Sequence, residues 1–196
     1  MNAKLRPLVP AFALLVIGLI ALGVAWYSVV NAPENAAASS IRERFSLVDQ
    51  TGKRVTEADF AGRPHLVFFG FTHCPDVCPT TLYELSTIFG ELGDDAGKID
   101  VIFISVDPER DTPQSMAEYV SSFGPQFTGL TGTKEEIAAV AKDFKVYYRK
   151  VPLEGNDYTI DHTAVVYLFN RRGEFVAPFN AKRPASEAAA ELRKLL

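Results

Sequence analysis

The sequence has few of the side chains that hold metal ions or carry redox chemistry: its 196 residues include 2 cysteines, 3 histidines and 2 methionines. The two cysteines, Cys74 and Cys78, are too few for the disulfide framework that stabilises small secreted domains. Both lie far from the N-terminus, which argues against a lipid-modified N-terminal cysteine. Any thiol chemistry must therefore use these two residues.

The chain also lacks an excess of positive charge. It has 20 lysine and arginine residues against 24 aspartate and glutamate residues, a formal net charge of −4. Domains that bind nucleic acids usually carry a basic patch or stripe. The composition therefore gives no electrostatic reason to expect a nucleic-acid partner.

Charged residues are absent between Leu8 and Val30, a stretch of 23 positions. As a helix this stretch would be about 34 Å long, enough to cross a hydrocarbon core of about 30 Å. Two basic residues precede it, Lys4 and Arg6. By the positive-inside rule we expect a cytoplasmic N-terminus over 1–7, a single transmembrane helix over 8–30 in the inner membrane, and a C-terminal domain in the periplasm.

A cleaved signal peptide is the alternative interpretation of this N-terminal segment, with Ala36–Ala38 as a small-residue cleavage site. Secretory apolar regions usually run about 7–15 residues, so this one is long for that role and an uncleaved anchor is favoured. Both interpretations place the rest of the chain on the same side of the membrane. Whether the segment is ever cleaved stays open.

Residues 31–40 show no apolar periodicity and are interpreted as a linker. From 41 to 196 the pattern indicates one domain in which buried strands alternate with amphipathic helices. Continuous apolar runs predict three strands that are buried on both faces: His65–Phe71, Ile99–Val106 and Thr163–Phe169.

Helix starts and an opening hairpin complete the predicted domain. Thr112 followed by proline, and the capping box Thr133–Glu136, each predict the N-terminus of a helix. Pro184–Leu196 is predicted to be a closing helix. Phe45–Val48 and Lys53–Val55 flank a turn sequence and predict a β-hairpin. The fold class is therefore α/β, a sandwich around a mostly parallel sheet with the hairpin at one edge.

The residue types that indicate chemistry are concentrated in Cys74-Pro-Asp-Val-Cys78-Pro79, directly after the first buried strand. Pro79 fits the first position of a helix capped near Cys78. A helix N-terminus stabilises thiolates, the form needed for metal binding and for disulfide exchange. Cysteines at i and i+4 in a helical turn have Cα atoms roughly 6 Å apart, which suits a reversible disulfide or one shared ion.

The residues alone leave the role of these cysteines and the identity of a third ligand open. Two inert buried cysteines are one alternative, and a permanent disulfide is another, although so short a loop would add little stability. The candidate third ligands are His65 at a strand end, His73 beside Cys74, and His162, which is expected to open the third buried strand after a polar loop. Asp161 would either orient that loop or lie in solvent.

Three segments resemble the Sco/SenC family of copper proteins, in the family's order. They are Gly70-Phe-Thr-His-Cys-Pro-Asp-Val-Cys-Pro79, Ser105-Val-Asp-Pro-Glu-Arg-Asp-Thr-Pro113 and Asp157-Tyr-Thr-Ile-Asp-His162-Thr. The resemblance covers roughly residues 41 to 196 together with the N-terminal anchor. It implies a thioredoxin-like fold and a copper site built from Cys74, Cys78 and His162.

The resemblance also implies a role in maturing the dinuclear copper centre of cytochrome c oxidase subunit II, with copper received from an upstream periplasmic donor. In the family, Asp107 and Asp111 are linked to function; the alternative for both is ordinary turn and helix-cap chemistry. Soft thiolates favour Cu(I), and imidazole suits both copper oxidation states, whereas structural zinc sites usually have four protein ligands. The expected cofactor is therefore copper.

Two other functions use the same cysteines. A thiol–disulfide reductase that keeps the oxidase's copper-ligating cysteines reduced is the main alternative to a copper chaperone. A peroxidase would need a supporting cationic group beside Cys74, and the sequence places none there. We therefore expect a metal-binding assembly factor and not a turnover enzyme, with thiol–disulfide exchange as an additional property.

Overall fold

The computed structural model describes residues 8–30 and 41–196 of the chain, and within the first range the side chains of 14–27. The chain divides into two compact units, with the division after Ala37. The N-terminus expected over 1–7 and the linker expected over 31–40 lie outside the described residues.

The first unit contains helix α1, Leu8–Val30. Its described side chains, over 14–27, are exposed. Over the residues described, the structure has no helix that is both long enough and apolar enough to cross a membrane. The transmembrane anchor is not confirmed and stays a prediction.

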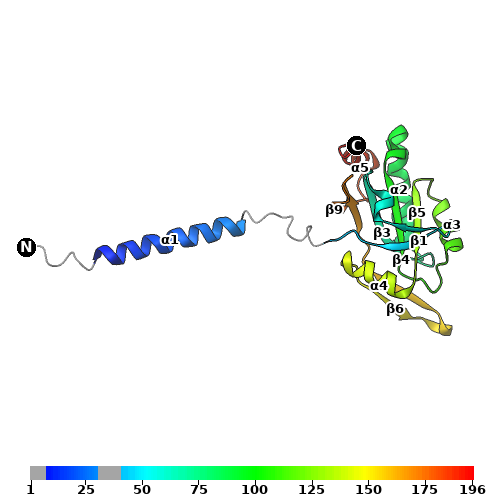
Figure 1. Ribbon diagram of the computed structural model, residues 1–196, viewed down its shortest axis with the longest axis horizontal. Coiled ribbons are helices and arrows are strands. Elements are labelled where there is room, and N and C mark those ends of the chain that lie inside the picture. The colour runs from blue at the N-terminus through cyan, green and yellow to red at the C-terminus, as the bar shows by residue number, and fades with distance from the viewer. Residues whose placement is uncertain (1–7, 31–40) are drawn as a thin grey trace, which may run out of the picture. The chain divides into compact units, whose positions relative to one another are not determined.

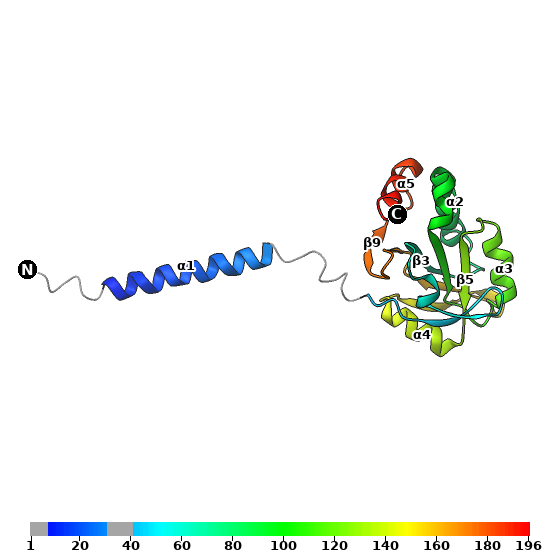
Figure 2. The same ribbon diagram turned by 45° about the horizontal axis from the view of Figure 1, so that its top comes forward.

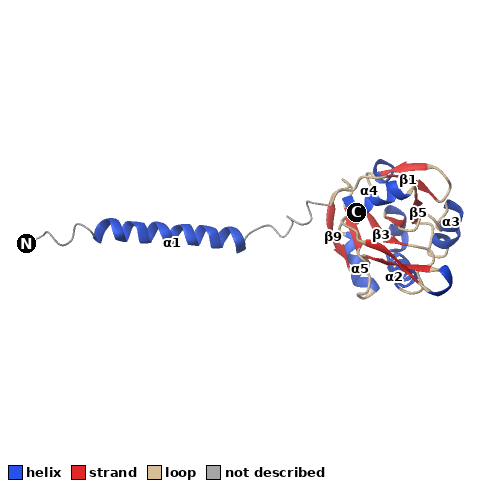
Figure 3. Ribbon diagram, turned by 90° about the horizontal axis from the view of Figure 1, so that it is seen from below, coloured by secondary structure: helices blue, strands red, loops and turns tan. Residues whose placement is uncertain are grey.

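The second unit is built on a seven-stranded sheet in the order β2-β1-β5-β4-β3-β8-β9. Figure 1 shows these strands in the body of the domain, and Figure 3 shows helices packed around them. The strand bounds are β1 Ser46–Asp49, β2 Arg54–Thr56, β3 His65–Gly70, β4 Asp100–Ser105, β5 Phe127–Thr131, β8 Val166–Phe169 and β9 Phe175–Phe179. Every residue of β3 and β4 is buried, as their apolar sequences predict.

Helices cover both faces of this sheet. Phe68 and Phe69 of β3 point to opposite faces because successive strand residues alternate. On the Phe68 face, Phe103 of β4 contacts Tyr119 of α3, with ring centroids 5.5 Å apart. On the Phe69 face lies Phe144, which ends α4, with centroids 5.1 Å apart. Figure 2 shows α4 apart from α2, α3 and α5 in the same way.

The starts of α3 and α4 agree with the predictions. Thr112 caps α3 and Thr133 caps α4, the latter with the complete capping box that the sequence predicts. The α-helices of this unit are α2 Val77–Leu92, α3 Pro113–Ser121, α4 Lys134–Asp143 and α5 Ala185–Arg193. Short 3-10 turns are η3 Glu57–Phe60, η4 Gly93–Lys98 and η5 Glu154–Asn156. The resulting α/β sandwich with an N-terminal hairpin is the predicted thioredoxin-like architecture.

Two features of the sheets differ from the prediction. The main sheet is mixed and not mostly parallel, because β4 is parallel to β3 and β5 while the other four pairings are antiparallel. The polar loop expected before His162 is instead part of a second, two-stranded sheet, in which β6 (Tyr148–Pro152) pairs antiparallel with β7 (Tyr158–His162). His162 therefore ends a strand of this small sheet and does not open a strand of the main one.

Candidate metal centre

Cys74 and Cys78 lie on the turn that joins β3 to α2. The helix begins two residues earlier than predicted, with Asp76 as its N-cap, so Cys78 and Pro79 occupy its first turn. Pro79 is tolerated there because backbone N–H groups of the first turn have no partner within the helix. The N–H of Cys78 points at the sulfur of Cys74, 3.4 Å away.

The structure brings His162 to this turn. Its Nε2 atom lies 3.4 Å from the Sγ of Cys78. Among the described residues, Cys74, Cys78 and His162 form the one group of three cysteine, histidine or acidic ligands close enough to share an ion, with ligand atoms within 4.8 Å of one another. Both cysteines are free thiols. The three predicted site residues therefore lie together.

The two sulfurs differ in accessibility and in charge. Cys74 is 9% exposed and Cys78 is fully buried. A hydrogen bond from the Cys78 side chain lowers the pKa of Cys74 to about 5, against the opposing effect of burial. The same contact, with burial, raises the pKa of Cys78. The proton that the pair shares is therefore favoured on Cys78, and the more accessible sulfur of Cys74 is favoured as the thiolate.

A backbone carbonyl and two aromatic rings, and not a carboxylate, orient the imidazole of His162. Its Nδ1 lies 3.2 Å from the carbonyl oxygen of Thr163, so Nδ1–H donates there and Nε2 keeps its lone pair toward Cys78. The ring also contacts Phe68 and Phe71 edge-on, with centroids 6.3 and 5.9 Å apart. This backbone carbonyl carries no sequence signal, and sequence reasoning missed it.

Asp161 does not take part in this orientation. It forms an exposed ion pair with Arg149 of β6, 3.2 Å between Nη2 and Oδ2. Because strand neighbours point to opposite faces, the Asp161 side chain points away from the face that carries His162. The structure places Asp161 in solvent, one of the two alternatives left open by the sequence.

The donor set fits copper. Ligand atoms that share one ion through bonds of about 2.0–2.3 Å lie roughly 3.5–4 Å apart, so the cluster needs only a small closing movement to surround an ion. Two thiolates suit Cu(I), and the imidazole suits both Cu(I) and Cu(II). With three protein ligands and no fourth among the described residues, the cluster lacks the complete shell of a structural zinc site.

The other two histidines lie outside the cluster. His65 is buried at the start of β3, where its ring stacks on Phe169 and its Nε2 pairs with the carboxylate of Glu43. His73 is 54% exposed at its side chain, and its Nδ1 lies 3.8 Å from Asp111. Of the three candidate third ligands, His162 is therefore the one that lies with the two cysteines.

Asp111 holds the start of the cysteine turn in place through hydrogen bonds. It is 1% exposed and accepts three hydrogen bonds: from the N–H and the hydroxyl of Thr72, and from the hydroxyl of Ser105. Thr72 lies two residues before Cys74. Asp111 thus ties the start of the cysteine turn to the end of β4, a role beyond ordinary turn chemistry.

Asp107 lies four residues before Asp111, at the start of the turn 107–111, and is fully buried. Its carboxylate accepts from the phenol of Tyr158, 2.8 Å away on β7, and from Nε of Arg110. Arg110 and Tyr158 lie in the second and third of the segments that carry the family resemblance, but nothing in their spacing predicts that both contact Asp107. Asp107 and Asp111 therefore bind different parts of the site: Asp107 contacts the strand that carries the histidine, and Asp111 contacts the turn that carries the cysteines.

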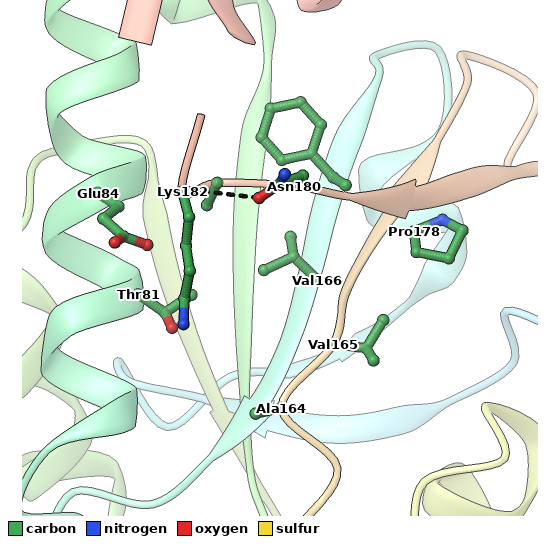
Figure 4. A pocket seen from close by; sticks show the side chains of 10 residues that line it. Thr81, Glu84, Ala164, Val165, Val166, Pro178, Asn180 and Lys182 are labelled. Atoms are coloured by element: carbon green, nitrogen blue, oxygen red, sulfur yellow. Dashed lines mark hydrogen bonds between the residues drawn. The ribbon is translucent and has the colours of Figure 1, made fainter. Parts of the chain in front are cut away.

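A pocket of about 210 Å³ lies between α2, the segment that follows His162 and the end of β9. Figure 4 shows Lys182 extending along α2 toward Thr81, with Ala164, Val165 and Val166 on the opposite wall. Thr81 lies one turn along α2 from Cys78, and Ala164 lies two residues after His162.

The fold and the cluster define a class of protein: a thioredoxin-like domain in which two cysteines and one histidine form a candidate metal-ion site. Residues 33–196 match the family model described as SCO1/SenC. The chain belongs to this family.

Similar proteins agree with this assignment. The SCO1 homolog 1, mitochondrial, of Arabidopsis thaliana is 46% identical over 149 residues, 75% of this chain and 44% of the relative. The chain spans about half the length of the curated relatives that it matches. The structure of Bradyrhizobium japonicum ScoI with copper bound is 54% identical, with a TM-score of 0.77, and covers 80% of this chain and 99% of that one.

A more distant structure concerns thiol chemistry. It is that of BsSco, described as a member of the Sco family of cytochrome c oxidase assembly proteins in which a disulfide switch was identified. It is 25% identical to this chain with a TM-score of 0.61, and covers 78% of this chain and 91% of that one.

Proposed function

We propose that this chain is a copper metallochaperone that binds one copper ion through Cys74, Cys78 and His162. The observation that carries the proposal is the convergence of the two sulfurs and the Nε2 atom within 4.8 Å of one another. The copper-bound structure of a relative 54% identical to this chain supports copper as the ion.

The site is suited to passing copper on. Cys74 is partly accessible, and the cluster has three protein ligands, so a partner's ligands can approach and replace them one at a time. The recipient in this proposal is the copper centre of cytochrome c oxidase subunit II, and the donor is a periplasmic copper protein. The description of the Sco family as cytochrome c oxidase assembly proteins supports this direction of transfer.

The proposed location is the periplasmic face of the inner membrane, with the N-terminal segment as anchor. A tethered domain meets a membrane-bound acceptor at a raised effective concentration. The uncharged sequence of 8–30 and the preceding basic residues support this arrangement.

A thiol–disulfide reductase is a second candidate, favoured by the pKa of Cys74, which lies near 5 and makes this sulfur a thiolate at neutral pH. The Cys74 thiolate would attack a partner's disulfide, forming a mixed disulfide and releasing one partner thiolate. Cys78 would then attack the sulfur of Cys74, which releases the second partner thiolate and leaves Cys74–Cys78 oxidised. The disulfide switch identified in BsSco supports such a reaction for a relative.

One deletion experiment separates the two functions. Cells that lack this chain, and have no second family member, are grown at limiting copper, and the copper content of cytochrome c oxidase is measured. The chaperone proposal expects low oxidase copper that added copper partly restores and a permeable thiol reductant does not. Rescue by the reductant alone would favour the reductase, and normal oxidase copper would contradict both.

A further inference from the structure

The strand that carries His162, β7, gains little stability from its own sheet. Among the strands of the described residues, β7 pairs with β6 alone, and an isolated two-stranded sheet is marginally stable. Its side chains alternate: Tyr158, Ile160 and His162 share the inward face, and Thr159 and Asp161 point outward. Ile160 is the one fully apolar inward residue, so hydrophobic burial specifies the register poorly.

A shift of β7 by one residue would turn His162 away from the cysteines and bring Asp161 to the inward face. A carboxylate in that position would make a different metal site. The identity of the third ligand therefore depends on whatever fixes the register and the facing of this strand.

Tyr158 is the residue that meets the body of the domain at the other end of the inward face. The guanidinium carbon of Arg110 lies 3.8 Å from the centroid of its ring, within the range of a cation–π contact. Nη1 of Arg110 also donates to the carbonyl oxygen of Tyr158, 3.0 Å away. The phenol donates to the buried carboxylate of Asp107, which accepts Nε of Arg110 as well.

Arg110 and Asp107 together contact the ring, the phenol and the backbone carbonyl of Tyr158. The ring of Tyr158 contacts Arg110 and its phenol donates to Asp107, and a slipped strand would offer Asp157 or Thr159 in its place. Asp107 is fully buried, so loss of the phenol would leave a carboxylate oxygen of the interior with one partner fewer. An exposed ion pair between Glu109 and Lys150, 2.7 Å, ties β6 to the same turn but is screened by water.

We propose that Arg110 and Tyr158 are positioning residues that fix the register of β7, so that His162 and not Asp161 faces Cys78. Tyr158 lies about 13 Å along the strand from His162 and contacts no ligand atom of the cluster. With Asp111 bound to Thr72, the turn 107–111 holds the cysteine half and the histidine half of the site in a fixed relation. The inference rests on the proposed copper function only for its metal readout.

The first test needs no copper. In the reduced full-length chain, proton NMR is used to observe the His162 ring and its nuclear Overhauser contacts with Phe71. We expect one set of His162 signals with these contacts in the wild type and in Arg149→Gln, which removes the exposed pair of the same hairpin. Arg110→Gln and Tyr158→Leu should weaken the contacts or add a second set of signals.

The second test uses Cu(I) and Cu(II) affinities of the same variants. Because the thiolates alone satisfy Cu(I), Arg110→Gln and Tyr158→Leu should lower Cu(II) affinity by at least about tenfold and change Cu(I) affinity by less than about threefold. Tyr158→Phe, which keeps the ring and loses the phenol, should fall between wild type and Tyr158→Leu. In a His162→Ala background, Arg110→Gln should cause no further loss, because its effect passes through the imidazole.

Unchanged His162 contacts and Cu(II) affinity in Arg110→Gln would overturn the proposal. So would an equal loss of Cu(I) and Cu(II), or a loss of the same size in the His162→Ala background, since either shows an effect that does not pass through His162. If Arg110→Gln does not fold, Arg110→Lys and Tyr158→Phe decide the matter by the same measurements. A wild-type chain that binds no copper contradicts the proposed function, while the NMR comparison still decides the positioning role.

Discussion

Gly70, the last residue of β3, and Cys78, in the first turn of α2, approach each other so closely that a Cβ on Gly70 would lie 2.6 Å from the Sγ of Cys78. The same Cβ would lie 2.7 Å from the ring of Phe103. Glycine is therefore required here by the position of a metal ligand and not by an unusual backbone conformation.

The change Gly70→Ala should displace the sulfur of Cys78 and weaken copper binding by at least about tenfold, roughly 1.4 kcal/mol. Gly90→Ala on α2 is the matched control, because a Cβ there meets nothing within 4 Å. Alanine within a helix should stabilise the control by about 0.5–1 kcal/mol. Copper titration with thermal unfolding of both variants checks this, and equal copper affinities would contradict it.

Proton release on metal binding should follow the unequal thiol pKa values. The pKa of Cys74 is about 5 and that of Cys78 is raised, so at pH 7 only Cys78 has a proton to lose. Cu(I) binding should release about one proton from the cysteines at pH 7 and approach two below about pH 5, where affinity should also fall.

Calorimetry in two buffers of different ionisation enthalpy measures this release. The His162→Ala chain is used so that the imidazole contributes no proton. Two protons released at pH 7 would show that Cys74 is not a thiolate before the metal binds.

Replacement of the nitrogen ligand should separate the two oxidation states. His162→Ala should lower Cu(II) affinity by at least about tenfold and leave Cu(I) affinity nearly unchanged, since Cu(II) prefers nitrogen donors and higher coordination. His73→Ala, which removes an exposed histidine next to Cys74, serves as the control. An unchanged Cu(II) spectrum in His162→Ala would exclude this residue as a ligand.

Copper should protect both cysteines from alkylation. Without metal the thiolate of Cys74 should react first, because Cys78 is fully buried and keeps its proton. Mild oxidation should form a reversible Cys74–Cys78 disulfide, which mass spectrometry of digested chain detects. Alkylation rates that do not change when copper is added would be inconsistent with a shared site.

Membrane topology is the remaining prediction. A reporter fused after Leu196 should be active only outside the cytoplasm, given the basic residues before the uncharged stretch 8–30. Replacing Lys4 and Arg6 with glutamine should weaken this orientation. Reporter activity in the cytoplasm for the wild-type fusion would remove the basis for a periplasmic copper protein.

The sequence predicts most of what is local along the chain. The buried runs of β3 and β4 and the caps Thr112 and Thr133 depend on residues close together, and the structure confirms them. The cysteine turn is local too, apart from a helix start that is two residues early. β5 was missed because Phe-Thr-Gly-Leu-Thr neither alternates nor forms a continuous apolar run.

Relations between distant segments could not be predicted from spacing. The direction of pairing between strands depends on connections that residue patterns do not encode, so the mixed sheet was missed. β7 has one buried apolar residue, Ile160, and therefore resembles a loop in sequence. The contacts between Arg110 and Tyr158 join residues 48 positions apart, and although each lies in a segment that carries the family resemblance, nothing in their spacing predicts the contact.

The separation of the ligands along the chain has a consequence for the order in which the site is assembled. Cys74 and Cys78 are 4 residues apart and can share Cu(I) as soon as that turn is made, whereas His162 is 84 residues from Cys78. A long segment must fold before the imidazole arrives, and closing a loop of that length has an entropic cost that only tertiary contacts offset. If the chain binds copper as proposed, we therefore expect an unfolded chain to capture Cu(I) alone, and we expect Cu(II) binding to require a chain that has finished folding.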